Sequence, residues 1–137
     1  MPLIEWGKEL ETGIRIIDKQ HRQWVDLIND LGRAVEAGHE ESVLRATVDA
    51  LWEYTTYHFR TEEGLMERHG YDAEELALHR REHRVFTDQI EIFRDRIGSG
   101  FQKMTPRVID YMYDWLVTHI TASDRGYIQT LQNGGVE

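Results

Sequence analysis

Cysteine is absent from the 137 residues of this chain. Its absence excludes disulfide bonds, zinc sites with thiolate ligands and iron–sulfur clusters, so any metal bound here is held by nitrogen and oxygen donors. Proline is scarce as well, with two residues in the whole chain. Because proline interrupts helices and strands and is enriched in disordered chains, this scarcity favours a helical globular protein.

Long hydrophobic runs and an excess of basic residues are also missing. No segment approaches the roughly 18 consecutive apolar residues of a membrane-spanning helix, and the first residues do not show the charged-then-apolar order of a signal peptide. We therefore expect no membrane insertion and a cytoplasmic location. The formal net charge of -9 argues against nucleic-acid binding, which depends on clustered Lys and Arg side chains.

What the chain does contain is amphipathic sequence. It is 40% hydrophobic and 30% charged, a composition typical of globular proteins, and we expect a single domain over residues 1–137. Four segments carry apolar residues at steps of three and four, the period of a helix with one buried face. These segments span 18–37, 41–68, 73–97 and 105–131.

Glycines separate these four segments. Gly38, Gly70 and the run at 98–100 mark three short connections. Short connections make consecutive helices antiparallel, so the predicted fold class is all-α, an antiparallel up-down-up-down four-helix bundle preceded by an N-terminal arm at residues 1–17. Residues that can cap a helix indicate three of the helix starts, namely Asp18, Asp72 ahead of Glu75, and Thr105 ahead of Pro106.

Seven ionisable residues occupy or adjoin the apolar stripes of these helices. Burial of such groups is costly unless they have partners, so each one needs a reason. Taken alone, each histidine is explained by a hydrogen bond to the backbone. Taken together, the seven are five imidazoles and two carboxylates spread over all four helices. They are His21, His58, Glu62, His79, His83, His119 and Asp124.

The spacing of these residues predicts that they lie at one depth in the bundle. Two residues equally far from a turn between antiparallel helices lie at the same height, because each residue rises about 1.5 Å. His21 and His58 are centred on the connection near Gly38, and His58 and His83 on the connection at Gly70. Ordinary core histidines give no reason for this coincidence. Three further pairs follow the same rule at the second and third connections: Glu62 with His79, His83 with His119, and His79 with Asp124.

Asp124 is the residue that a regular helix does not accommodate. It lies five positions after His119, which is about 140° around an ideal helix. The apolar stripe of the 105–131 segment also slips by one or two positions between these two residues. We therefore predict one wide, π-type turn between His119 and Asp124, since such turns are frequent at functional sites.

Seven donors exceed the number that one metal ion takes. Two ions that share bridging carboxylates use all seven, and a set rich in imidazole and free of thiolate suits iron better than manganese, which prefers oxygen ligands. The alternative is a metal-free interaction bundle, which does not explain the shared midpoints. His39 and His69 fall in predicted connections and are expected to be solvated non-ligands, while Glu63 is expected at the surface or behind a ligand.

The residues around these positions resemble the bacterial hemerythrins. The matching stretches are 12–21, 58–63, 79–83 and 115–124, so the resemblance covers nearly the whole chain. It implies two iron ions joined by two carboxylates and by a solvent-derived oxo or hydroxo bridge, with one coordination position open on the second iron. The resemblance assigns His79, His83 and His119 to the first iron, His21 and His58 to the second, and Glu62 and Asp124 to the bridges.

The same resemblance implies a function. In such proteins dioxygen binds the open iron, is held as a hydroperoxide and is released by the reverse steps. We therefore expect reversible dioxygen binding for storage, sensing or delivery to an oxygen-using enzyme, in a monomer or weak oligomer that is not itself an enzyme. Leu116 and Trp115 are expected to line the oxygen pocket.

The alternative on the same site is a diiron oxidase, a peroxidase or an enzyme that handles nitric oxide. Diiron oxidases built on helical bundles use mostly carboxylate ligands, whereas this set is mostly neutral imidazole. Fewer anionic donors should support high-valent iron less well. The composition of the set therefore favours the oxygen carrier.

Overall fold

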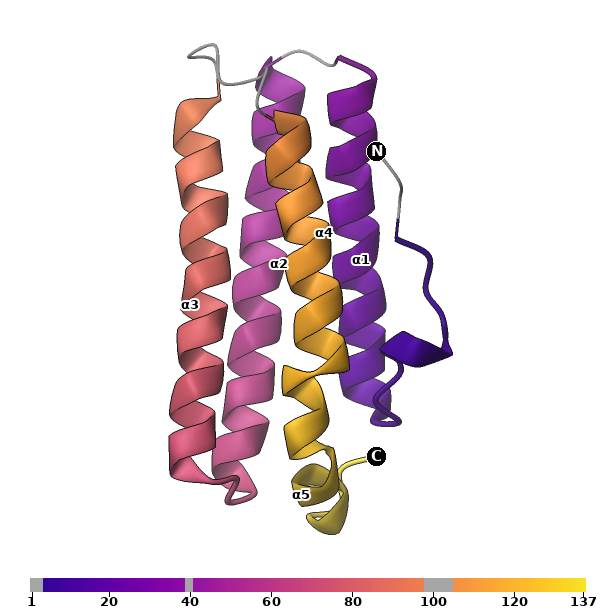
Figure 1. The fold of residues 1–137 in the computed structure, drawn as a ribbon, viewed down its shortest axis with the longest axis vertical. Coiled ribbons are helices and arrows are strands. Elements are labelled where there is room, and N and C mark those ends of the chain that lie inside the picture. The colour runs from indigo at the N-terminus through magenta and orange to yellow at the C-terminus, as the bar shows by residue number, and fades with distance from the viewer. Residues whose placement is uncertain (1–3, 39–40, 98–104) are drawn as a thin grey trace.

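Four long helices make up most of the molecule. The computed structural model describes residues 4–38, 41–97 and 105–137, and the side chains of the last range from residue 109 onward. Over these residues all regular structure is helical. The long helices lie side by side and alternate in direction (Figure 1), which confirms the predicted antiparallel four-helix bundle. They are α1 (Arg15–Glu36), α2 (Glu41–Arg68), α3 (Ala73–Arg96) and α4 (Thr105–Thr121).

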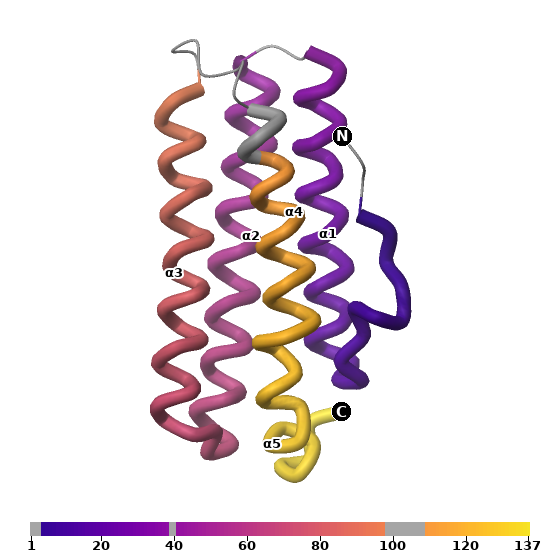
Figure 2. The backbone as a smooth tube through the Cα atoms, in the orientation of Figure 1, coloured from indigo at the N-terminus to yellow at the C-terminus, as the bar shows by residue number. Residues whose placement is uncertain are grey.

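The arm ahead of α1 lies along the outside of that helix, as Figure 2 shows. It contains one short 3-10 turn, η1 (Lys8–Leu10). The backbone of Ile4 pairs with the side chain of Asn29: its N–H donates to the amide oxygen and its C=O accepts from the amide nitrogen, each at 2.9 Å. These two bonds attach the start of the arm to α1.

α1 begins at Arg15, three residues ahead of the predicted start. The predicted N-cap at Asp18 is wrong, because this residue lies inside the first turns of the helix. Its carboxylate instead accepts hydrogen bonds from the backbone N–H groups of Thr12 at 2.7 Å and Gly13 at 3.1 Å, both ahead of the helix. In a capping box, a side chain in the first turn also accepts a hydrogen bond from a backbone N–H ahead of the helix. The bonds to Asp18 are of this kind, and they allow the helix to start before Asp18.

α2 and α3 follow the predicted ranges closely. α2 spans 41–68 as predicted, and α3 ends one residue before its predicted end. Asp72 caps α3 by accepting from the backbone N–H of Glu75 at 3.1 Å. Between the two helices Gly70 has a φ of 72°, a conformation that glycine adopts without steric cost. The predicted connection at 98–100 lies outside the described residues.

The fourth predicted helix, 105–131, is broken in the structure. α4 ends at Thr121, a 3-10 segment η3 (Ser123–Tyr127) follows, and a short helix α5 (Ile128–Asn133) comes last (Figure 1). The helix is irregular between His119 and Asp124, as predicted, but the predicted π-type turn is wrong. The backbone departs from helical geometry at Ala122, with φ -115° and ψ -69°, and then tightens instead of widening.

Two apolar clusters fill the interior of the bundle. One includes Leu51 and Ile90, and the other, at the end where α2 meets α3, includes Ile17 and Leu76. On α1 and α3 the predicted ligand residues fall between the two clusters, so the polar centre is enclosed by apolar packing on both sides. Among the described residues, no helix is long and apolar enough to cross a membrane.

Candidate metal centre

The structure brings all seven predicted residues together in the interior. Each of them is at most 3% exposed. Their ligand atoms form two groups, and within each group the atoms lie within 4.8 Å of one another. Glu62 belongs to both groups and so joins them. The larger group consists of Glu62, His79, His83, His119 and Asp124, and the smaller group consists of His21, His58 and Glu62.

Asp124 reaches this centre because of the break after α4. Its Oδ2 lies 3.1 Å from Nε2 of His21, and its Oδ1 lies 2.9 Å from Nε2 of His79 and 3.1 Å from Nε2 of His119. The residue therefore stands between the imidazoles of the two groups. An unbroken helix would carry it about 140° away from His119.

Glu62 occupies the matching position on α2. Its Oε1 lies 3.1 Å from Nε2 of His58 and 3.5 Å from Nε2 of His83, and its Oε2 lies 3.5 Å from Nε2 of His21. Tyr127, from η3, donates a hydrogen bond of 2.5 Å to that same Oε2. Both carboxylates thus face imidazoles from both sides, which is the placement a bridging ligand needs.

Three imidazoles are oriented by hydrogen bonds on their outer nitrogen. Nδ1 of His58 faces the amide oxygen of Gln20 at 2.9 Å. Nδ1 of His83 faces the carboxylate of Glu63 at 2.9 Å, and Nδ1 of His119 faces the carboxylate of Glu82 at 3.0 Å. Because these oxygens only accept, the proton of each neutral ring lies on Nδ1, and the lone pair of Nε2 points inward.

The inward Nε2 lone pairs lie close to the lone pairs of other imidazole nitrogens and of carboxylate oxygens. Nε2 of His83 and Nε2 of His119 are 3.0 Å apart, and neither can donate to the other while both rings are neutral. Buried Nε2 of His58, Nε2 of His79 and both carboxylate oxygens of Asp124 have no hydrogen-bond partner among the described residues. Electron-rich atoms this close require a cation between them, either protons or metal ions. The residues present therefore fit a metal centre.

The carboxylates control the charge of this site. Burial lowers the pKa of His21, but the close carboxylates of Asp124 and Glu62 outweigh burial and raise that pKa to about 9. Burial likewise lowers the pKa of His119, but Asp124 and then Glu82 raise it to about 10.

The two inner carboxylates show the opposite shift. Burial raises the pKa of Glu62, but the charge of the His58 imidazole and the close contacts of the carboxylate with the imidazoles of His21, His58 and His83 hold it well below 4.5. Burial and the charge of Glu62 raise the pKa of Asp124, but His119 and His21 hold it below its ordinary value. Both groups are therefore ionised at neutral pH, as metal ligands must be.

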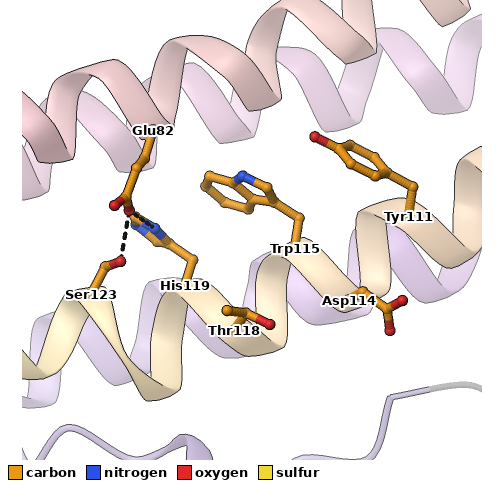
Figure 3. Close-up of a pocket in the computed structure, with 7 residues that line it drawn as sticks. All are labelled: Glu82, Tyr111, Asp114, Trp115, Thr118, His119 and Ser123. Atoms are coloured by element: carbon orange, nitrogen blue, oxygen red, sulfur yellow. Dashed lines mark hydrogen bonds and ion pairs between the residues drawn. The ribbon is translucent and has the colours of Figure 1, made fainter.

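Several residues at the site were not predicted from the sequence. Gln20 and Glu82 orient ligand imidazoles, and Tyr127 holds Glu62. Ser123 donates from its hydroxyl to Glu82 at 2.6 Å, and the same carboxylate also binds His119 (Figure 3). Only the position of Gln20, next to His21, offers a sequence signal, because the others lie at positions that ordinary surface or core residues also occupy.

The remaining sequence expectations have mixed outcomes. Glu63 lies behind a ligand, which is one of the two roles expected for it. His69 belongs to neither group, although it is half-buried and not fully solvated. His39 lies outside the described residues.

Aromatic side chains surround the two groups. The ring of Trp115 stacks on His119, with centroids 4.4 Å apart and an interplanar angle of 13°. It also lines a surface cavity of about 360 Å³ together with His119, Glu82 and Ser123 (Figure 3). Trp115 therefore lies against the larger group, and its ring also packs edge-on against Trp24, with centroids 6.1 Å apart. Its place in an oxygen pocket stays a prediction. Leu116 is fully buried in the apolar cluster that includes Leu51 and Ile90.

The fold and the site define a class of protein, a helical bundle whose buried imidazoles and ionised carboxylates fit two metal ions. The model of the hemerythrin HHE cation binding domain matches residues 12–131. The chain therefore belongs to the hemerythrin family.

Known members of this family resemble the chain along most of its length. The bacteriohemerythrin of Pseudomonas aeruginosa is 32% identical over 133 residues, which are 97% of this chain and 84% of that protein. The bacteriohemerythrin of Methylococcus capsulatus is 28% identical over 93% of this chain and 95% of that protein. A crystal structure of wild-type hemerythrin superposes with a TM-score of 0.83, at 28% identity, covering 95% of this chain and 98% of that one.

Proposed function

We propose that this protein binds dioxygen reversibly at a diiron centre and does not turn it over as an enzyme. The observation that carries this proposal is the inequality of the two ligand groups. The larger group offers three imidazoles and the smaller group offers two, and the two groups share the carboxylate of Glu62. A metal ion held by the smaller group would have fewer protein ligands, and the position left open is where a small molecule would bind.

Iron is the metal that the donor set and the family together favour. Imidazole suits iron, and carboxylates between two groups suit a bridged pair of ions. When bound, two iron ions supply the electrons that dioxygen takes up on binding and returns on release. In this assignment His79, His83 and His119 would hold one ion, His21 and His58 would hold the other, and Glu62 and Asp124 would be shared between them.

The surroundings of the smaller group exclude water. The indole of Trp24 lies 5.1 Å from the ring of His58, centroid to centroid, and edge-on rings of Phe59 and Phe86 pack against that indole at 5.3 and 5.5 Å. The indole N–H donates to Thr55 at 3.0 Å, which fixes the ring. A dry pocket would limit the entry of water and protons, which promote irreversible oxidation of the centre by bound dioxygen.

Leu116 and Tyr127 complete the proposed roles. Leu116 is the apolar wall of the oxygen pocket, since it is fully buried one turn before His119. Burial and the charges of Asp124 and Glu62 raise the pKa of Tyr127 well above 10. Its hydroxyl therefore keeps its proton and holds the carboxylate of Glu62 in place through the 2.5 Å hydrogen bond.

The test is an optical cycle of the iron-loaded protein. The protein is reduced without oxygen, exposed to air and then returned to argon. The proposal predicts a charge-transfer absorption that appears in air and disappears under argon over repeated cycles. Irreversible oxidation with continuous consumption of a reductant would support the enzyme instead. His79→Ala serves as the control, because it should lose the diiron centre and the absorption with it.

A further inference from the structure

The hydrogen-bond partners of the imidazole Nδ1 atoms differ in charge between the two groups. In the larger group, Nδ1 of His83 donates to the carboxylate of Glu63 at 2.9 Å, and Nδ1 of His119 donates to the carboxylate of Glu82 at 3.0 Å. Two of the three imidazoles in this group therefore have an anion directly behind them.

In the smaller group, no carboxylate of the described residues lies against Nδ1 of either imidazole. Nδ1 of His58 donates to the amide oxygen of Gln20 at 2.9 Å, and the amide nitrogen of Gln20 donates in turn to the hydroxyl of Tyr57 at 3.4 Å. This partner is neutral. Nδ1 of His21 is buried and finds no hydrogen-bond partner in the described part of the chain.

The two anions behind the larger group have different neighbours. Arg80 lies against Glu63 at 3.0 Å and offsets part of its charge. Glu82, by contrast, is held by His119 and by the hydroxyl of Ser123 at 2.6 Å (Figure 3), and no Lys or Arg side chain in the described part of the chain forms a salt bridge with it. These two donors fix Glu82 between α3, α4 and η3.

An anion behind a ligand imidazole makes that ligand a better electron donor and stabilises the more highly charged metal ion. We infer that Glu82 and Glu63 are positioning residues that make the two irons electronically unequal, so that the iron held by His79, His83 and His119 is oxidised first. The inference rests on the diiron centre of the proposed function. Its consequence is that the half-oxidised protein keeps the iron with the open position ferrous.

The experiment measures the two one-electron reduction potentials of the iron-loaded full-length protein by spectroelectrochemical titration without oxygen. The variants are Glu82→Gln and Glu63→Gln, which keep the shape and remove the charge, and Gln20→Glu, which adds a charge behind His58. Glu91→Gln is the matched control, because Glu91 is an exposed carboxylate on α3 that contacts no predicted ligand.

Glu82→Gln and Glu63→Gln should each make the first oxidation step harder. Removal of partners of ligand imidazoles typically costs about 10- to 100-fold in metal affinity. Because the lost charge weakens the binding of the more highly charged ion most, we expect about a tenfold change in the ratio of oxidised to reduced iron, which is 59 mV for one electron. Gln20→Glu should instead make the second step easier and leave the first unchanged.

Equal potentials in Glu82→Gln and Glu91→Gln would overturn the inference, and so would a shift confined to the second step. Should Glu82→Gln fail to retain iron, Glu63→Gln and Gln20→Glu decide the question by the same criteria. A wild-type protein that holds two irons but does not bind dioxygen reversibly contradicts the proposed function and leaves this prediction standing. A wild-type protein that holds no iron overturns both.

Discussion

Metal binding should expel protons from this site in a number that the structure specifies. The pKa of His21 is raised to about 9 and that of His119 to about 10, so at pH 7.5 each ring of the metal-free protein is more than about 95% protonated. Metal ligands must be deprotonated. Glu62 and Asp124 are already ionised, because their pKa values are lowered. These four groups together therefore release about two protons per chain when metal binds.

Titration calorimetry of the metal-free protein with ferrous iron or zinc measures this number. The apparent binding enthalpy is recorded at pH 7.5 in buffers that differ in ionisation enthalpy, and the slope gives the protons released. At pH 10.5 the release from His21 and His119 should fall below one, since most of both rings have already lost their protons. His69→Gln is the control and should leave the slope unchanged. Metal binding without proton release at pH 7.5 would refute the reasoning.

Three further perturbations have definite expected outcomes. Because the pKa values of His21 and His119 are raised, the metal-free protein should lose unfolding free energy as pH rises from about 6.5 to about 10; urea titrations measure it, and a rise over this range contradicts the assignment. Tyr127→Phe leaves a buried carboxylate oxygen unpaired, which should cost about 1–3 kcal/mol in unfolding free energy; a neutral effect argues against the hydrogen bond. Leu116→Ser should speed autoxidation of the oxygenated protein, followed by absorbance, and an unchanged rate removes Leu116 from the pocket wall.

The bundle could be predicted because its signals are local. Apolar residues at helical steps and glycines such as Gly70 fix the helices and their turns without knowledge of the partner helix. The start of α1 could not be predicted. It depends on the hydrogen bond that the backbone N–H of Thr12 donates to Asp18, and the sequence does not reveal the conformation of the segment around Thr12.

The inner residues of the centre could be predicted and the outer ones could not. Pairs equidistant from a turn lie at one height whatever the side chains around them, and that rule brings His58 and His83 together. Gln20 and Glu82 depend on the rotation of one helix against its neighbour, which spacing does not give. The break at Ala122 is similar: the misfit of Asp124 locates an irregularity, but a π turn and a 3-10 segment both correct it.

Oxygen uptake by the reduced, iron-loaded protein tests the carrier function most directly. Dioxygen consumed is measured with an electrode against the iron content of the same sample, and the gas returned under argon is measured afterwards. Reversible binding at one diiron centre predicts one dioxygen taken up for every two irons and its recovery on deoxygenation. Uptake that continues beyond this ratio in the presence of a reductant, or dioxygen that does not return, would contradict it.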